Sequence, residues 1–287
     1  MRLDDVRESS NVEDRRGEGG VGLGGLGIAG VLLAAAVSWF FGLDFNQAMQ
    51  LVSGGGQVVQ SQQVAARPAK PVPVNDQQAR FVAKALAVTE DVWGELFQRQ
   101  GRVYAPPKLV LFRDRVQTAC GTASSAVGPF YCAGEQKLFI DLAFLDHLQK
   151  QLGAQGDFAR AYVIAHEVGH HIQHLTGALE KAHQQMSRLG GTAANRVSVR
   201  LELQADCYAG VWGFYAAQRN LLDPGDAETA LNAARAVGDD SLQQRAGHEV
   251  VPDSFTHGSA TQRMQWFQRG MTGGNPGQCN TFSTERP

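Results

Sequence analysis

The chain has 287 residues, of which 43% are hydrophobic, 19% charged and 8% aromatic, a composition that can bury a sizeable core and excludes a chain disordered throughout. The 26 Lys and Arg against 28 Asp and Glu give a net charge of −2, which argues against a general polyanion binder. The four Cys are too few for a scaffold held by disulfides alone, and none has C-x-x-C spacing, which excludes a zinc ribbon and a thioredoxin motif.

The chain opens with a charged stretch followed by a long uncharged one. Residues 1–20 are charged and short of apolar side chains, which predicts a solvated, cytoplasmic tail. Residues 21–43 contain no charge, and a helix of that length spans about 30 Å of hydrocarbon. Trp39 and the two Phe after it suit the aromatic belt at a membrane surface. We therefore expect residues 21–43 to be a transmembrane anchor.

Two rival interpretations of residues 21–43 fit the sequence less well. A cleaved signal peptide has an apolar core of about 7–15 residues, and this apolar run continues well beyond that. Gly22, Gly24 and Gly27 spell G-x-G-x-x-G, but a dinucleotide-binding fingerprint follows a strand, and here a charged tail precedes it.

The flanking charges predict how the anchor is oriented. Four Arg precede residues 21–43, and no cation follows until Arg67. The positive-inside rule then places the N-terminus in the cytoplasm and the rest outside, as in a single-pass protein of a bacterial inner membrane. That outer compartment is oxidising, so Cys residues can pair there. Residues 44–75 contain Gly-, Gln-, Ser- and Pro-rich stretches and predict a flexible linker, and residues 76–287 form the predicted globular domain.

Within the domain, periodicity predicts helices and strands in separate runs. Apolar spacing of three and four residues predicts helices, and short β-branched and aromatic runs predict strands. The predicted helices cover residues 76–100, 158–175, 198–217 and 259–269, the last ended by Gly270, and the predicted strands cover 108–113 and 137–142. This order indicates an α+β fold.

The most informative segment is His-Glu-Val-Gly-His at residues 166–170. On a helix, residues i and i+4 share one face, so His166 and His170 can bind one metal ion. Glu167 is rotated by about 100° from His166, where it can take a proton from a metal-bound water. The segment also has the apolar face that such a helix requires. A helix with incidental histidines is the alternative.

A catalytic zinc ion takes a third protein ligand and keeps a fourth position open. A metzincin would have glycine and histidine where this chain has Gln173 and Thr176, which excludes that class. Glu202 and Asp206 lie four residues apart on a later apolar segment. One of them can ligate zinc while the other accepts an N–H from a ligand imidazole. A half-exposed polar stripe is the alternative interpretation.

Together these segments resemble the putative neutral zinc metallopeptidases, a family of bacterial membrane-anchored proteins with gluzincin-type zinc sites. The resemblance also covers residues 119–132, 139–142 and 255–267, and spans roughly residues 76–280 with the charged start and the anchor. It implies a zincin-like domain with a small sheet. It also implies particular roles: Zn²⁺ ligands His166, His170 and Glu202, general base Glu167, and Asp206 as the residue that orients a ligand imidazole.

Other polar residues have more open assignments. An oxyanion formed during hydrolysis needs a donor besides the metal, and His257, before a predicted helix, is the first candidate. Tyr208 and His248 follow it, and a structural role is the alternative for His257. His171 and His174 extend the histidine run, and we expect them to have supporting or surface roles, because three ligands are already assigned.

The four Cys fit two disulfides, and one strand fits a substrate-binding role. The spacing of Cys120 and Cys132 is consistent with a hairpin-spanning disulfide, and Cys207 and Cys279 remain for a second. Such a bridge typically contributes about 2–4 kcal/mol. In peptidases of the type that the chain resembles, a strand such as residues 137–141 offers its edge to an extended substrate.

The sequence therefore predicts a single-pass membrane protein whose extracytoplasmic domain is a zinc metalloendopeptidase-like hydrolase. It would cleave peptide bonds of proteins or peptides in the cell envelope and have no nucleic-acid partner. One alternative is a non-catalytic, zinc-stabilised binding protein at the membrane, with a fourth ligand from His171, His174 or a Cys. Another is a regulatory protein in which the anchor and the linker matter most.

Overall fold

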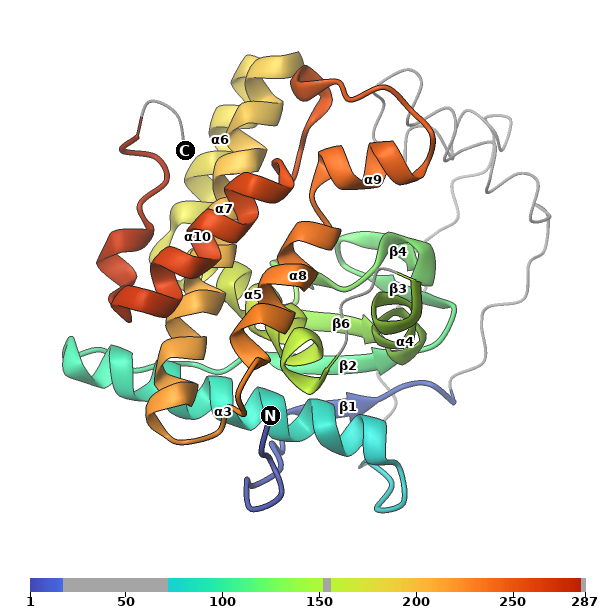
Figure 1. The fold of residues 1–287 in the computed structure, drawn as a ribbon, viewed down its shortest axis with the longest axis vertical. Helices are drawn as coiled ribbons and strands as arrows, with labels where there is room; N and C mark the ends of the chain where they lie inside the picture. Colours follow the sequence, from blue (N-terminus) through green and yellow to red (C-terminus); the bar gives the residue numbers. More distant parts are fainter. Residues whose placement is uncertain (18–71, 152–155, 285–287) are drawn as a thin grey trace.

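The computed structural model describes residues 1–17, 72–151 and 156–284 (Figure 1). The described strands are β1 (Val12–Asp14), β2 (Lys108–Phe112), β3 (Arg115–Thr118), β4 (Gly121–Ser124), β5 (Phe130–Cys132) and β6 (Lys137–Asp141). The described α-helices are α3 (Gln77–Arg99), α4 (Leu142–Gln151), α5 (Asp157–Thr176), α6 (Ala178–Leu189), α7 (Gly191–Gln218), α8 (Asp226–Ala236), α9 (Asp239–Arg245) and α10 (Ala260–Gly273). Short 3-10 turns are η1 (Ser125–Val127), η2 (Pro252–Ser254) and η3 (Pro276–Cys279). The predicted α+β class is confirmed.

A small mixed sheet separates two apolar layers. Its strand order is β1-β2-β6-β5, with β1, β2 and β6 parallel and β5 antiparallel at one edge. Leu109 and Leu111 of β2 belong to the main core with the helices, whereas Val110 and Phe112 pack in a second cluster with the β3–β4 hairpin. This alternation follows from the two-residue period of a strand. Because both faces of β2 are buried, its sequence is one continuous apolar run.

Residues 1–17 pack on the domain, so the prediction of a solvated tail is wrong for the part that the structure describes. β1 pairs with β2 and extends the sheet. Leu3 and Val12 are 6% and 8% exposed and belong to the main core. Composition alone did not predict this arrangement, because many charged side chains of the segment are paired with charges on the domain instead of being solvated.

The predicted anchor at residues 21–43 and the linker up to residue 71 lie outside the described residues. In the described ranges, no helix combines the length and the apolar character that crossing a membrane requires. The anchor therefore stays a prediction from the sequence.

Helices α5 and α7 form the centre of the domain, and both were predicted with shorter bounds. α5 ends at Thr176, and the capping residue Gly177 adopts a left-handed conformation that favours glycine. The predicted end of the last helix at Gly270 is wrong, because α10 continues to Gly273. There glycine serves close packing: a Cβ on Gly270 would lie 2.0 Å from the backbone oxygen of Cys207 in α7. The contact brings α10 against α7, behind the candidate site.

Candidate active site

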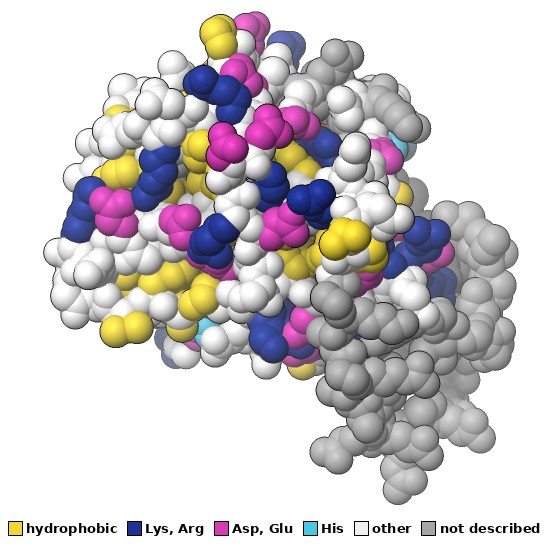
Figure 2. All heavy atoms as spheres, turned by 90° about the horizontal axis from the view of Figure 1, so that it is seen from below, with side chains coloured by type: hydrophobic (Ala, Val, Ile, Leu, Met, Phe, Trp, Pro, Cys, Tyr) yellow, Lys and Arg dark blue, Asp and Glu magenta, His cyan; other side chains and the backbone are white. Residues whose placement is uncertain are grey.

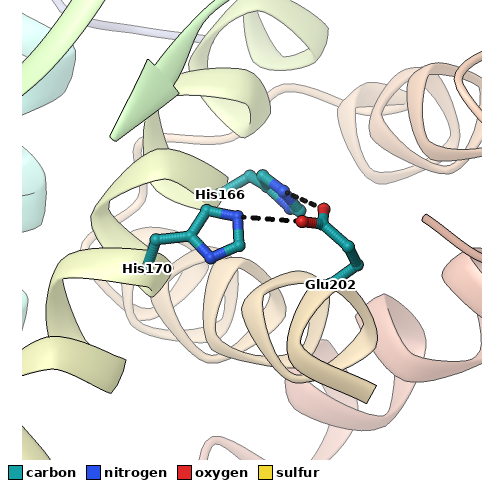
Figure 3. Close-up of side chains that lie close together, drawn as sticks. All are labelled: His166, His170 and Glu202. Carbon is teal, nitrogen blue, oxygen red and sulfur yellow. Dashed lines mark hydrogen bonds and ion pairs between the residues drawn. The ribbon is translucent and has the colours of Figure 1, made fainter. Parts of the chain in front are cut away.

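Three predicted ligands meet between α5 and α7 (Figure 3). The Nε2 atom of His166 lies 3.1 Å from Glu202 Oε2, and the Nε2 atom of His170 lies 3.5 Å from Glu202 Oε1. One ligand atom from each of the three residues lies within 4.8 Å of the others. The structure therefore brings together the two imidazoles of one helical turn and a carboxylate from a second helix, as the sequence predicts.

A close contact between the two helices makes this convergence possible. Gly169 lies between the two histidines, and a Cβ there would lie 2.9 Å from the backbone oxygen of Ala205. A side chain at position 169 would therefore push α5 and α7 apart. The glycine of the motif thus lets Glu202 reach the histidines, a role that the sequence alone did not reveal.

Asp206 lies behind His166 and holds its outer nitrogen. Its Oδ1 atom accepts a hydrogen bond from His166 Nδ1 at 2.9 Å and another from the Tyr162 hydroxyl at 2.6 Å. Arg263 of α10 donates to both carboxylate oxygens of Asp206. The predicted position of Asp206, beside a ligand imidazole, agrees with this geometry. Tyr162, which precedes His166 on α5, and Arg263 are additions that needed the fold, because their contacts with Asp206 span 44 and 57 residues.

Gln173 plays the corresponding part for His170. Its side-chain oxygen lies 2.9 Å from His170 Nδ1, which donates to it, and leaves Nε2 facing Glu202. The amide nitrogen of Gln173 donates to the backbone oxygen of Leu201 and to Gln204. Gln173 is fully buried. Sequence reasoning used this residue only to exclude a metzincin, although its position three residues after His170 was a signal for such a contact.

The imidazoles and carboxylates of the site shift the pKa values of one another. Burial lowers the pKa of His166, but Asp206 and Glu202 outweigh it and raise this pKa to about 10. Burial raises the pKa of Glu202, but His170 and His166 outweigh it and hold this pKa well below the usual value. A metal ion binds the neutral imidazole, so metal binding at these residues releases protons.

Glu167 lies beside the three converging residues without joining them. It is 7% exposed, and together with His166, His170 and Glu202 it lines one cleft. Burial raises the pKa of its carboxyl, and the imidazoles of His170 and His166 oppose that shift. A buried carboxylate with a raised pKa is suited to accept a proton near neutral pH.

The donor set fits a zinc ion with an open coordination position. Two imidazoles and one carboxylate are ligands that zinc takes in catalytic sites. The side chains proposed as a fourth ligand are engaged elsewhere. His171 contacts the Tyr131 hydroxyl and the backbone oxygen of Ala105, and His174 pairs with Glu180. The four Cys form the two expected disulfides, Cys120–Cys132 and Cys207–Cys279.

His257 lines the cleft, and Asp239 holds its loop. The Asp239 carboxylate accepts backbone N–H groups from Thr256, His257 and Gly258, and it lies 3.2 Å from His257 Nδ1. Burial lowers the pKa of His257, but Asp239 and then Glu202 outweigh it and raise this pKa. Sequence reasoning missed Asp239, because its contact with His257 spans 18 residues.

The two other oxyanion candidates lie elsewhere. Tyr208 packs edge-on against Trp93, with ring centroids 5.5 Å apart, and it does not line the cleft. Burial raises its pKa to about 12. His248 does not line the cleft either. Of the three candidates, the structure therefore brings only His257 to the cleft.

The cleft that contains these residues has a volume of about 740 Å³. α5 and α7 supply His166, Glu167, His170 and Glu202, and α6, α9 and the segment around η1 and β5 supply further lining residues. A cavity of this size accommodates a short stretch of peptide.

Comparison with known proteins agrees with this geometry. The model of a family described as putative neutral zinc metallopeptidase matches residues 1–282. The chain belongs to this family. It is 48% identical to the uncharacterized protein YpfJ of Escherichia coli K12, over 98% of this chain and 99% of that protein. It is 43% identical to the uncharacterized protein Rv2575 of Mycobacterium tuberculosis, over 72% of this chain and 71% of that protein. No solved structure matches the chain.

Membership of the family makes zinc the expected metal, and the His166, His170 and Glu202 group is able to hold it. The family description also indicates a hydrolase that acts on proteins or peptides.

Proposed function

We propose that the protein is a zinc-dependent endopeptidase in which His166, His170 and Glu202 hold the metal. The convergence of these three side chains within 4.8 Å, with Glu167 next to them in the cleft, carries the proposal. Zinc, when bound, supplies a Lewis acid that acidifies a water molecule and polarises the scissile carbonyl.

Residues of the chain perform the proton transfer, orient the imidazoles and stabilise the developing negative charge. Glu167 accepts the proton of the attacking water and returns it to the leaving amine. Asp206 and Gln173 fix the outer nitrogens of the two imidazoles, so the inner nitrogens stay aimed at the metal position. His257, held by Asp239, donates a hydrogen bond to the carbonyl oxygen as negative charge develops there.

We also propose that the domain works outside the cytoplasm, at the cell envelope. Two disulfides support this location, because such bonds persist in oxidising compartments. The uncharged run at residues 21–43 supports attachment to a membrane. Together these features indicate envelope proteins or peptides as substrates.

Metal removal and return tests the proposed function. The purified full chain should contain about one zinc ion, cleave an unstructured protein, lose activity to a chelator and regain it with zinc. His166→Asn should lose both zinc and activity, whereas His174→Asn, on the same helix but outside the ligand group, should keep both. Hydrolysis that survives complete zinc removal would disprove the proposal.

A further inference from the structure

We propose that residues 1–17 are a structural part of the metallopeptidase domain and lie on the same side of the membrane as that domain. The orientation predicted from the sequence puts a bilayer between the two. β1 can pair with β2 only when no bilayer separates them, so the paired arrangement replaces the single membrane crossing that the sequence predicted.

Backbone and core contacts favour the paired arrangement. The N–H of Leu109 donates to the backbone oxygen of Asn11 at 2.8 Å, and the N–H of Arg15 donates to Leu111 at 2.9 Å. Leu3 and Val12 are buried among the side chains of the main core. Removal of the segment would expose an apolar edge of β2, and proteins avoid such edges.

A carboxylate on α3 depends on donors from the segment. The side chain of Glu90 is only 9% exposed. Its Oε1 atom accepts hydrogen bonds from Ser9 and Asn11, and Oε2 accepts one from Arg7 at 2.9 Å. A carboxylate with so little exposure requires hydrogen-bond partners, and three come from residues 7–11.

Ion pairs extend this match along the segment. The side chain of Glu13 is 13% exposed and lies 3.1 Å from both Lys108 and Lys137. Arg16 pairs with Asp76 at 2.6 Å. Figure 2 shows the face that carries α3, where basic and acidic side chains lie next to one another.

These ion pairs also explain the N-terminal arginines without reference to membrane orientation. The orientation rule counted four Arg ahead of residues 21–43. Arg2, Arg7 and Arg16 of that group have carboxylate partners in the domain. Their presence is explained by docking, so it no longer indicates a cytoplasmic N-terminus.

Labelling of the full chain in its membrane tests the shared location. Asp5→Cys introduces a thiol on the segment, and Arg196→Cys introduces one on an exposed position of α7. A membrane-impermeant maleimide should label both thiols in intact spheroplasts, or neither until lysis. Labelling of Arg196→Cys before lysis and of Asp5→Cys only after lysis, or the reverse, would overturn the proposal.

Thermal unfolding tests docking independently of location. Val12→Asp places a charge in the core and should lower the Tm of the full chain by several degrees. Ser10→Asp, at an exposed position of the same segment, should leave the Tm within about 1 °C. Equal Tm values for both variants would overturn the docked segment.

A second inference rests on the proposed function and concerns its substrates. We infer that the cleft takes interior stretches of an extended polypeptide with bulky apolar side chains next to the scissile bond. Most of the lining is apolar, with contributions from several elements: Val127, Phe130, Phe144, Leu179, Met186, Leu201 and Leu242. Val127 and Leu242 are 61% and 41% exposed, so the lining also offers accessible apolar surface that a bound apolar side chain can cover.

The charges of the cleft favour the same substrate class. Apart from histidines, the charged side chains among its described lining residues are Glu167, Glu202 and Arg263. Arg263 is 4% exposed and bound to Asp206, so it is not available to a substrate carboxylate. Glu202 is assigned to the metal, and Glu167 is assigned to proton transfer from the attacking water. Apart from its histidines, the described lining therefore offers no charged partner for a chain terminus or a charged side chain, as an exopeptidase would require.

Paired peptides test the substrate class. With the zinc-loaded full chain, a peptide with Leu or Phe at the cleavage site should have a kcat/KM at least tenfold above that of one with Glu or Lys. Leu242→Lys and Met186→Lys should reduce this ratio, whereas Leu189→Lys, on the exposed end of α6, should not. Equal hydrolysis of all peptides would overturn the inference and leave the proposed function standing.

Absence of any hydrolysis would instead count against the proposed function. Binding of the same labelled peptides to the zinc-loaded chain, measured by fluorescence polarisation, then decides the substrate class. Preferential binding of the apolar peptides would support it, and equal or absent binding would overturn it.

Discussion

Arg263 holds Asp206 through both carboxylate oxygens. The Nε atom lies 2.8 Å from Oδ2 and the Nη2 atom lies 3.0 Å from Oδ1, and both side chains are buried. Because Asp206 also accepts from His166, this ion pair connects α10 to the candidate metal centre. The centre therefore depends on an element that contributes no ligand.

Loss of Arg263 should destabilise the protein strongly. In Arg263→Gln, Asp206 stays buried without its cation, and breaking such a pair costs about 3–5 kcal/mol. Urea unfolding of the full chain measures the free energy of unfolding. Arg269→Gln, on the same helix but exposed over Trp266, should cost less than about 1 kcal/mol. Equal effects of the two substitutions would contradict the role of the buried pair.

Loss of the Gln173 contact should weaken zinc binding while the fold stays intact. Gln173→Met removes the acceptor of His170 Nδ1, and outer contacts of this kind are worth about 10–100-fold in metal affinity. Competition with a chromogenic chelator measures that affinity. Gln184→Met, at an exposed position of α6, provides the control. Unchanged affinity in Gln173→Met would show that His170 is held by other contacts.

The contact between Asp239 and His257 should appear in the pH dependence of hydrolysis. If a protonated His257 stabilises the oxyanion, kcat falls as pH rises through its pKa. Asp239 raises that pKa, so Asp239→Asn should move the basic limb of the pH profile to lower pH. Zinc affinity should not change, because Asp239 contacts none of the proposed ligands. A basic limb at the same pH as in wild type would remove His257 from the mechanism.

Two glycine substitutions should change the free energy of unfolding in opposite directions. Gly270→Ala places a Cβ 2.0 Å from the backbone of α7 and should destabilise the protein by more than about 2 kcal/mol. Gly94→Ala, in α3 with no neighbouring atom within 4 Å of the added carbon, should stabilise it by about 0.5–1 kcal/mol. Denaturant unfolding compares the two. Equal stability of both variants would contradict the close approach of α7 and α10.

The candidate ligands were predictable because local geometry dictates them. His166 and His170 share a helix face by periodicity, and the apolar flanks of residues 158–175 predicted that helix. Glu202 needed the resemblance to a known family for its role, because a contact across 36 residues leaves no periodic signal.

The missed features arise from packing between distant segments. Residues 1–17 look solvated by composition, yet their charges match those of α3 and the sheet. Gly270 resembles a helix stop, but it lies inside α10, where absence of a side chain permits contact with α7. Neither arrangement can be read from the local sequence, since each depends on what the fold places opposite.

Hydrolysis of an unstructured protein by zinc-loaded Glu167→Gln tests the central claim most directly. The substitution keeps the size of the side chain and removes its ability to accept a proton. The variant should bind zinc as wild type does and lose at least about 100-fold in kcat, in line with general-base catalysis. Turnover at the wild-type rate with zinc bound would contradict the assignment of Glu167 and the mechanism built on it.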